Sequence, residues 1–148
     1  MKNKKFNFLK PTLIFLIVGF FIPGFTVVAL LGFQMLLTSL GIECHNAWNI
    51  LWTITVLGGL ILPILFYRHI QYLTEKKLKN LKLRLTLFNF FEYIFIQASL
   101  ALFFTSGQTL CYVSDGQNGM ELVFTAWLAL PILIGFSFLF QLTLRKNE

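Results

Sequence analysis

Charged residues are scarce in this chain, and long stretches of it contain none. Only 12% of the 148 residues are Asp, Glu, Lys or Arg, whereas 57% are hydrophobic. Soluble domains contain about 25% charged residues, so this composition argues against a water-soluble fold. Acidic residues are the rarer kind, with 6 Asp and Glu against 12 Lys and Arg. The length allows a single domain over residues 1–148.

Motifs that carry out known chemistry are also absent. The sequence has no phosphate-binding loop, no dinucleotide fingerprint and no nucleophile elbow. His45 lies beside Cys44 and near Glu43, Asp115 and Glu121 in the expected topology, but their spacing matches no metal-ligand pattern. We therefore expect a protein that is not an enzyme and that has no cofactor and no metal site.

The few basic residues fall into three clusters. These are Lys2, Lys4, Lys5 and Lys10 at the N-terminus, then Arg68, Lys76, Lys77, Lys79, Lys82 and Arg84, and finally Arg145 and Lys146. Two apolar runs lie between successive clusters, and the segments that join these runs, around 43–46 and 111–121, contain no Lys or Arg. Because cytoplasmic loops retain Lys and Arg while translocated loops are depleted of them, both termini and the central loop are predicted to be cytoplasmic.

The apolar runs predict an all-α integral membrane protein, a bundle of four transmembrane helices. About 20 apolar residues cross the hydrocarbon core. We expect helices over about 12–37, 47–67, 85–106 and 122–144, with a basic cytoplasmic loop over about 68–84. Pro23-Gly24 should kink the first helix. The first run is longer than a cleavable signal core, so we expect it to be retained.

The net charge of +6 is compatible with nucleic-acid binding, but its distribution favours another partner. The basic residues flank membrane-length runs, so we expect them to face the anionic inner leaflet and expect no nucleic acid. The loop residues also follow an approximate helical stripe, which predicts a solvated helical extension, with a dedicated lipid or protein docking site as the alternative. The abundance of Phe, Ile, Leu, Asn and Lys is typical of AT-rich genes, which favours the cytoplasmic (inner) membrane of a bacterium.

The chain has only two cysteines, Cys44 and Cys111, and the predicted topology places one in each external loop. In an oxidising compartment we expect a disulfide between them that ties the two helical hairpins together. Free thiols and a catalytic thiol pair are the alternatives. Four-helix thiol oxidoreductases use a C-x-x-C pair, which neither cysteine has.

Glu92 is the only acidic residue inside a predicted transmembrane helix, about 12 Å beyond Arg84 by the helical rise. A carboxylate in hydrocarbon is costly, so Glu92 should face other helices and be protonated or paired. We expect Asn89 or Gln141 near its carboxyl group, and we expect Gln97 to form interhelical hydrogen bonds. Glu92 could be a packing residue, or it could relay protons, bind a cation or contact a partner's helix.

In size and expected topology the chain resembles the four-helix immunity proteins that protect bacteria from pore-forming colicins, without a shared motif. Small multidrug transporters also have four helices and one membrane Glu, but theirs lies in the first helix. The resemblance implies a non-enzymatic protein that binds another membrane protein in an immunity, exclusion or accessory-subunit role. The alternatives are an oligomeric transporter or channel that uses Glu92, and a thiol redox enzyme. Assembly into a homo-oligomer is left open.

Overall fold

The computed structural model describes residues 6–22, 25–71, 80–104 and 120–146, and these ranges contain five α-helices and no strand. The prediction of an all-α fold is therefore confirmed for this part of the chain. The helices are α1 (Leu9–Phe21), α2 (Phe25–Ser39), α3 (Cys44–Gln71), α4 (Leu81–Phe104) and α6 (Met120–Lys146). Residues 72–79 of the predicted basic loop, including Lys76, Lys77 and Lys79, lie outside the described residues.

The prediction of a single kinked helix over about 12–37 is wrong, because the structure has two helices there. Ile22 follows α1 with φ −127° and ψ 59°, outside the helical region. The ring of a proline disfavours the helical conformation of the residue before it, so Pro23 ends α1 at Phe21. At about 1.5 Å per residue, neither α1 nor α2 is long enough to cross a bilayer alone.

Two helices are long and apolar enough to cross a membrane, α3 and residues 123–143 of α6. Only 22% and 33% of their most apolar stretches are buried within the protein, so neither resembles the enclosed core helix of a soluble domain. α4 has 24 residues, but Arg84, Glu92 and its buried amides make it less apolar. Four membrane-spanning helices are therefore not shown.

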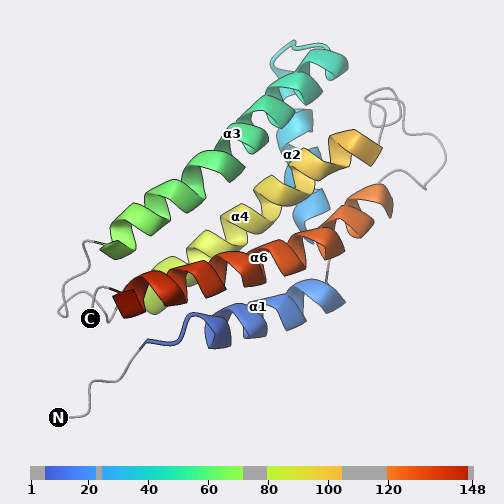
Figure 1. The fold of residues 1–148 in the computed structure, drawn as a ribbon. Coiled ribbons are helices and arrows are strands. Elements are labelled where there is room, and N and C mark those ends of the chain that lie inside the picture. The colour runs from blue at the N-terminus through green and yellow to red at the C-terminus, as the bar shows by residue number, and fades with distance from the viewer. Residues whose placement is uncertain (1–5, 23–24, 72–79, 105–119, 147–148) are drawn as a thin grey trace.

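The helices form a bundle in which α4 is central. Figure 1 shows α3, α4 and α6 running alongside one another, with α1 beside α6 and α2 inclined steeply to them. α3 and α6 each pack extensively along α4 and contact each other much less, while α1 packs on α6 and α4 and α2 packs on α3. Both chain termini lie at the end of the bundle where α3 ends and α4 begins (Figure 1).

The core near the chain termini contains a cluster of aromatic rings. The rings of Phe66 and Phe88 stack with centroids 4.7 Å apart, and the ring of Phe140 lies 5.0 Å and 5.2 Å from them. Phe8 joins this group through Phe140 at 6.2 Å. These four residues belong to α3, α4, α6 and the segment before α1, so the rings hold together the elements at this end.

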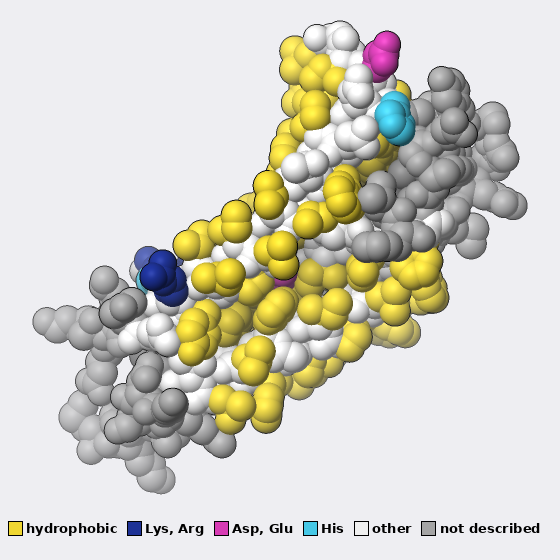
Figure 2. Space-filling view, turned by 45° about the horizontal axis from the view of Figure 1, so that its top comes forward, with side chains coloured by type: hydrophobic (Ala, Val, Ile, Leu, Met, Phe, Trp, Pro, Cys, Tyr) yellow, Lys and Arg dark blue, Asp and Glu magenta, His cyan; other side chains and the backbone are white. Residues whose placement is uncertain are grey.

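The outer surface is apolar along the length of the helices. Large exposed apolar side chains occur on every described helix, including Phe21, Met35, Leu60, Leu83 and Phe138. Figure 2 shows apolar side chains over much of this face, with Lys and Arg gathered at one end and an acidic side chain and a histidine at the other. Such a large apolar surface indicates contact with a membrane or with other proteins.

Candidate functional site

Three fully buried polar side chains lie on α4, namely Asn89, Glu92 and Gln97. All three were singled out from the sequence, and all three avoid the outer surface as expected. Buried polar groups normally have hydrogen-bond partners. The partners of each side chain therefore show which helices it connects. Gln97 interacts with other groups of the protein.

Asn89 belongs to a polar network that joins three helices. Its Nδ2 donates a hydrogen bond to Thr12 Oγ1 at 3.0 Å, and Thr12 Oγ1 lies 2.7 Å from Ser137 Oγ. Thr12 and Ser137 are fully buried and belong to α1 and α6. The sequence analysis missed both residues, because an isolated hydroxyl in an apolar run does not reveal which helix it faces.

Gln141 has a different partner from the one that was expected. Its Oε1 accepts a hydrogen bond from the backbone N–H of Phe8 at 3.0 Å. Phe8 directly precedes α1. The first backbone N–H groups of a helix have no hydrogen-bond partner within that helix. Gln141 therefore fixes the start of α1 against α6. Asn89 or Gln141 was expected near the carboxyl group of Glu92, and neither forms a hydrogen bond with it.

Glu92 is fully buried, and neither oxygen of its carboxyl group has a hydrogen-bond partner among the described residues. A Cβ atom built on Gly59 would lie 3.9 Å from Glu92 Oε1. The carboxyl group therefore lies against α3 at a position where the neighbouring residue has no side chain. A buried acceptor without a donor is costly, and each such group in a structure calls for an explanation.

Glu92 is one of the residues that line a cavity of about 260 Å³ between α3, α4 and α6. The cavity is lined by Val56, Gly59, Leu60, Glu92, Ile96, Ser99, Leu100, Ile132 and Phe136. Ser99 is the only other residue in this lining with a polar side chain, and its Oγ donates a hydrogen bond to the carbonyl oxygen of Phe95 at 2.6 Å. Among the described residues that line this apolar chamber, Glu92 is thus the only ionisable one.

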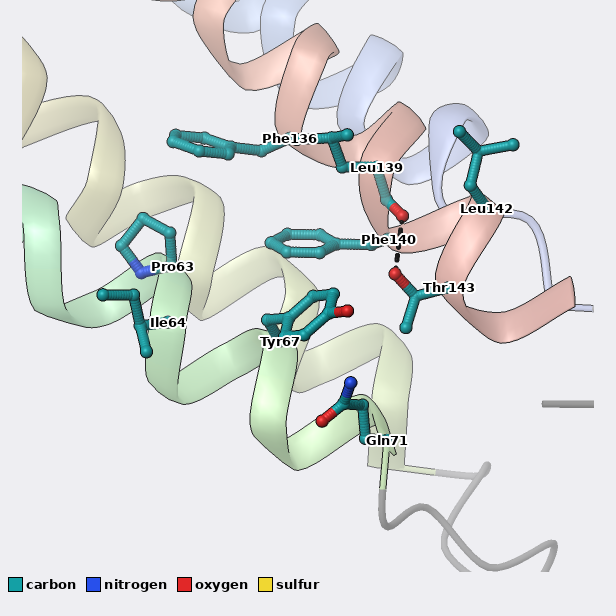
Figure 3. Close-up of a pocket in the computed structure, with 9 residues that line it drawn as sticks. All are labelled: Pro63, Ile64, Tyr67, Gln71, Phe136, Leu139, Phe140, Leu142 and Thr143. Carbon is teal, nitrogen blue, oxygen red and sulfur yellow. Dashed lines mark hydrogen bonds between the residues drawn. The ribbon is translucent and has the colours of Figure 1, made fainter. Parts of the chain in front are cut away.

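A second cavity, of about 510 Å³, continues toward the end of the bundle that holds the chain termini (Figure 3). It lies between α3 and α6 and is lined by Pro63, Ile64, Tyr67, Gln71, Phe136, Leu139, Phe140, Leu142 and Thr143. In Figure 3 the rings of Phe136 and Phe140 project from α6 toward α3, and Pro63 and Tyr67 face them. Phe136 lines both cavities, so the two lie next to each other between α3 and α6, and we call them together the α3–α6 groove.

The described residues of the basic cluster, Arg68, Lys82 and Arg84, are exposed. Arg84 Nη1 contacts the ring nitrogens of His69. Both residues line an apolar cavity of about 350 Å³ with Phe66, Phe88 and other side chains of α3 and α4. The α3 helix continues to Gln71 and α4 begins at Leu81, so part of the predicted helical extension into the basic loop is present.

Cys44 begins α3 at the other end of that helix, as the predicted topology requires. Gln34 Nε2 donates a hydrogen bond to Cys44 Sγ at 2.7 Å. Cys111 lies outside the described residues, so the Cys44–Cys111 bridge stays a prediction. Within the part of the chain that the structure describes, no group of three His, Cys, Asp or Glu side chains could hold a metal ion.

Comparison with models of protein families, with curated proteins and with solved structures finds no match to this chain.

Proposed function

We propose that this chain is a non-enzymatic integral membrane protein that acts by binding another membrane protein through the α3–α6 groove. The observation that carries the proposal is an apolar groove whose inner chamber contains a buried carboxyl group without a partner among the described residues. Amphipathic helices bind proteins by laying their apolar face into such grooves. Immunity, exclusion and accessory-subunit roles all require this kind of contact.

In this proposal α1 and α2 together cross the membrane once as a broken helix. The helices α3, α4 and α6 each cross it once. Broken helices are tolerated in membranes where neighbouring helices or polar side chains satisfy the freed backbone groups. At the end of α1, next to the break, the hydroxyl of Tyr93 donates to the carbonyl oxygen of Gly19 at 3.3 Å and Trp127 Nε1 donates to that of Phe20 at 3.4 Å. We take the end of the bundle with Arg68, Lys82 and Arg84 to be the cytoplasmic end, in a bacterial inner membrane, because cytoplasmic segments retain Lys and Arg and anionic lipids attract them.

Within a bilayer, two helices associate through close packing and hydrogen bonds rather than through the hydrophobic effect, because lipid tails are as apolar as the helices. A groove between splayed helices offers more packing surface than a convex helix face does. The weak contact between α3 and α6, compared with the contact of each with α4, leaves this surface available to a partner.

Blocking the groove tests the proposal. Leu139 lines the groove and is 54% exposed, whereas Phe138 is 53% exposed and does not line it. Tagged wild type, Leu139→Trp and Phe138→Trp would be purified from native membranes in mild detergent and their bound proteins identified by mass spectrometry. We expect a membrane protein that is retained by wild type and Phe138→Trp and lost from Leu139→Trp. The same set of bound proteins with both variants would contradict the proposal.

A small oligomeric transporter or channel is the second candidate, and the burial of Glu92 in a chamber favours it. Membrane carboxyl groups are common in proton and cation pathways. Flux of protons or monovalent cations into liposomes separates the two candidates, since a binding protein gives none. Flux that is present in wild type and lost in a folded Glu92→Gln variant would favour the transporter.

A further inference from the structure

We infer that the helix bound in the α3–α6 groove carries a lysine or arginine side chain that enters the inner chamber and pairs with the carboxylate of Glu92. This inference rests on the proposed function, because it specifies the chemistry of the partner in that groove. It starts from the two acceptor oxygens of Glu92, which are fully buried and have no hydrogen-bond partner among the described residues.

The described side chains around Glu92 do not provide the missing donor. Asn89 Nδ2 donates to Thr12, and the hydroxyl of Ser99 donates to the carbonyl of Phe95. Tyr93 donates to the carbonyl oxygen of Gly19 at 3.3 Å. On the other two walls of the chamber, α3 and α6 contribute only apolar side chains and Gly59. The described basic residue closest to Glu92 along α4 is Arg84, about 12 Å nearer the end with the termini.

A water molecule fits this chamber poorly as the missing partner. Buried waters typically make about three hydrogen bonds to polar groups. Among the residues that line the chamber, Glu92 and Ser99 alone have polar side chains. A lysine ammonium or an arginine guanidinium fits better, because each has several donors and no acceptor. A hydrogen bond between two charged groups is also stronger than one between neutral groups.

The shape of the groove favours a side chain carried by a helix over a free ion. Leu60 to Gln71 on α3 and Ile132 to Thr143 on α6 form the two walls. Each wall extends for about 16 Å along its helix, or about three turns. The chamber with Glu92 lies at the inner end of this length. A helix lying in the groove would therefore place its basic residue about three turns from the cytoplasmic edge of its membrane span.

Synthetic transmembrane peptides test the inference without knowledge of the natural partner. The peptides would be Leu/Ala helices that differ at one central position, which is Lys, Gln or Leu. Binding to the full chain would be measured by energy transfer in phosphatidylcholine vesicles, which have no net charge. We expect the Lys peptide to bind wild type at least tenfold more tightly than the Leu or Gln peptide. In Glu92→Gln, Lys and Leu peptides should bind within about twofold of each other.

Glu43→Gln is the matched control, because Glu43 is an exposed acid at the other end of α3. This variant should keep the full preference for the Lys peptide. Comparison of the three peptides on wild type alone keeps the test decisive even if Glu92→Gln does not fold. Equal binding of the Lys and Leu peptides, or of the Lys and Gln peptides, would overturn the inference.

The inference and the proposed function fail in different ways. If Leu139→Trp loses a natural partner while the peptides bind wild type equally, the groove binds a partner but the pairing with Glu92 is wrong. If the Lys peptide is preferred while Leu139→Trp and Phe138→Trp retain the same proteins, Glu92 pairs with cationic helices and the proposed function is wrong.

Discussion

The two adjacent glycines of α3 provide a matched pair of substitutions with different expected effects. A Cβ atom built on Gly58 would lie 2.7 Å from Phe95 Cε2 and 2.9 Å from two other atoms of that ring. A Cβ atom built on Gly59 would lie 3.5 Å from Phe95 Cβ, an ordinary van der Waals contact. Gly58→Ala should therefore displace the ring of Phe95, whereas Gly59→Ala should fit.

The magnitude follows from two effects. Replacing Gly by Ala in a helix gains up to about 1 kcal/mol of helix propensity, and both variants share this gain. Overpacking costs about 1–3 kcal/mol, and only Gly58→Ala incurs it. The free energy of unfolding of Gly58→Ala should therefore be lower than that of Gly59→Ala by about 1–3 kcal/mol.

Denaturant unfolding in detergent micelles, followed by circular dichroism, would measure this difference. A Phe95→Leu background provides a further control, because the cost of Gly58→Ala should be smaller once the ring is gone. Equal stabilities of the two alanine variants, within about 0.5 kcal/mol, would refute the close packing of α3 on α4 at this position.

Three further predictions concern the topology, the disulfide and the polar network. In a background with both cysteines replaced by Ser, a cysteine introduced at Asn80 should react with a membrane-impermeant reagent only after the cells are opened. Labelling of this cysteine in intact cells would contradict the cytoplasmic position of the loop. Protein from an oxidising compartment should show no free thiol, and Cys44→Ser should lower the melting temperature, because closing the loop to Cys111 contributes about 4–5 kcal/mol in the chain-entropy model. Thiols that titrate in the unreduced protein would exclude the bridge. Thr12→Val should lower the free energy of unfolding by about 1–3 kcal/mol, because it leaves buried polar groups without a partner. The control Thr143→Val removes only a hydrogen bond to Leu139 O within its own helix and should change the free energy of unfolding by less than about 0.5 kcal/mol. Equal effects of the two variants would argue against the network.

The sequence alone predicted the three longer helices to within a few residues. The runs over 47–67, 85–106 and 122–144 correspond to α3, α4 and α6, because uninterrupted apolar residues between polar segments leave little freedom in where a helix lies. It did not predict that Pro23-Gly24 divides the first run. Whether a proline kinks or ends a helix depends on how the following segment packs, and here α2 packs on α3 while α1 packs on α6 and α4.

The burial of Glu92 was predictable, since exposing a carboxyl group to hydrocarbon is costly. Its neighbours were not predictable, because they depend on the rotation of α4 and on which helices flank it. The groove was not predictable either, since it arises from the separation of α3 and α6. Gly58 has no side chain, and the ring of Phe95 on α4 lies against it.

Site-specific photo-crosslinking in native membranes tests the central claim most directly. A photoreactive amino acid would be placed at Ile64 and at Leu139, which line the groove from α3 and α6. Ile61 and Phe138 are the controls, because they are also at least half exposed, at 50% and 53%, and do not line the groove. The account predicts a crosslink to the same membrane protein from Ile64 and Leu139 and none from Ile61 or Phe138. Equal crosslinking from all four positions, or none from the groove, would contradict it.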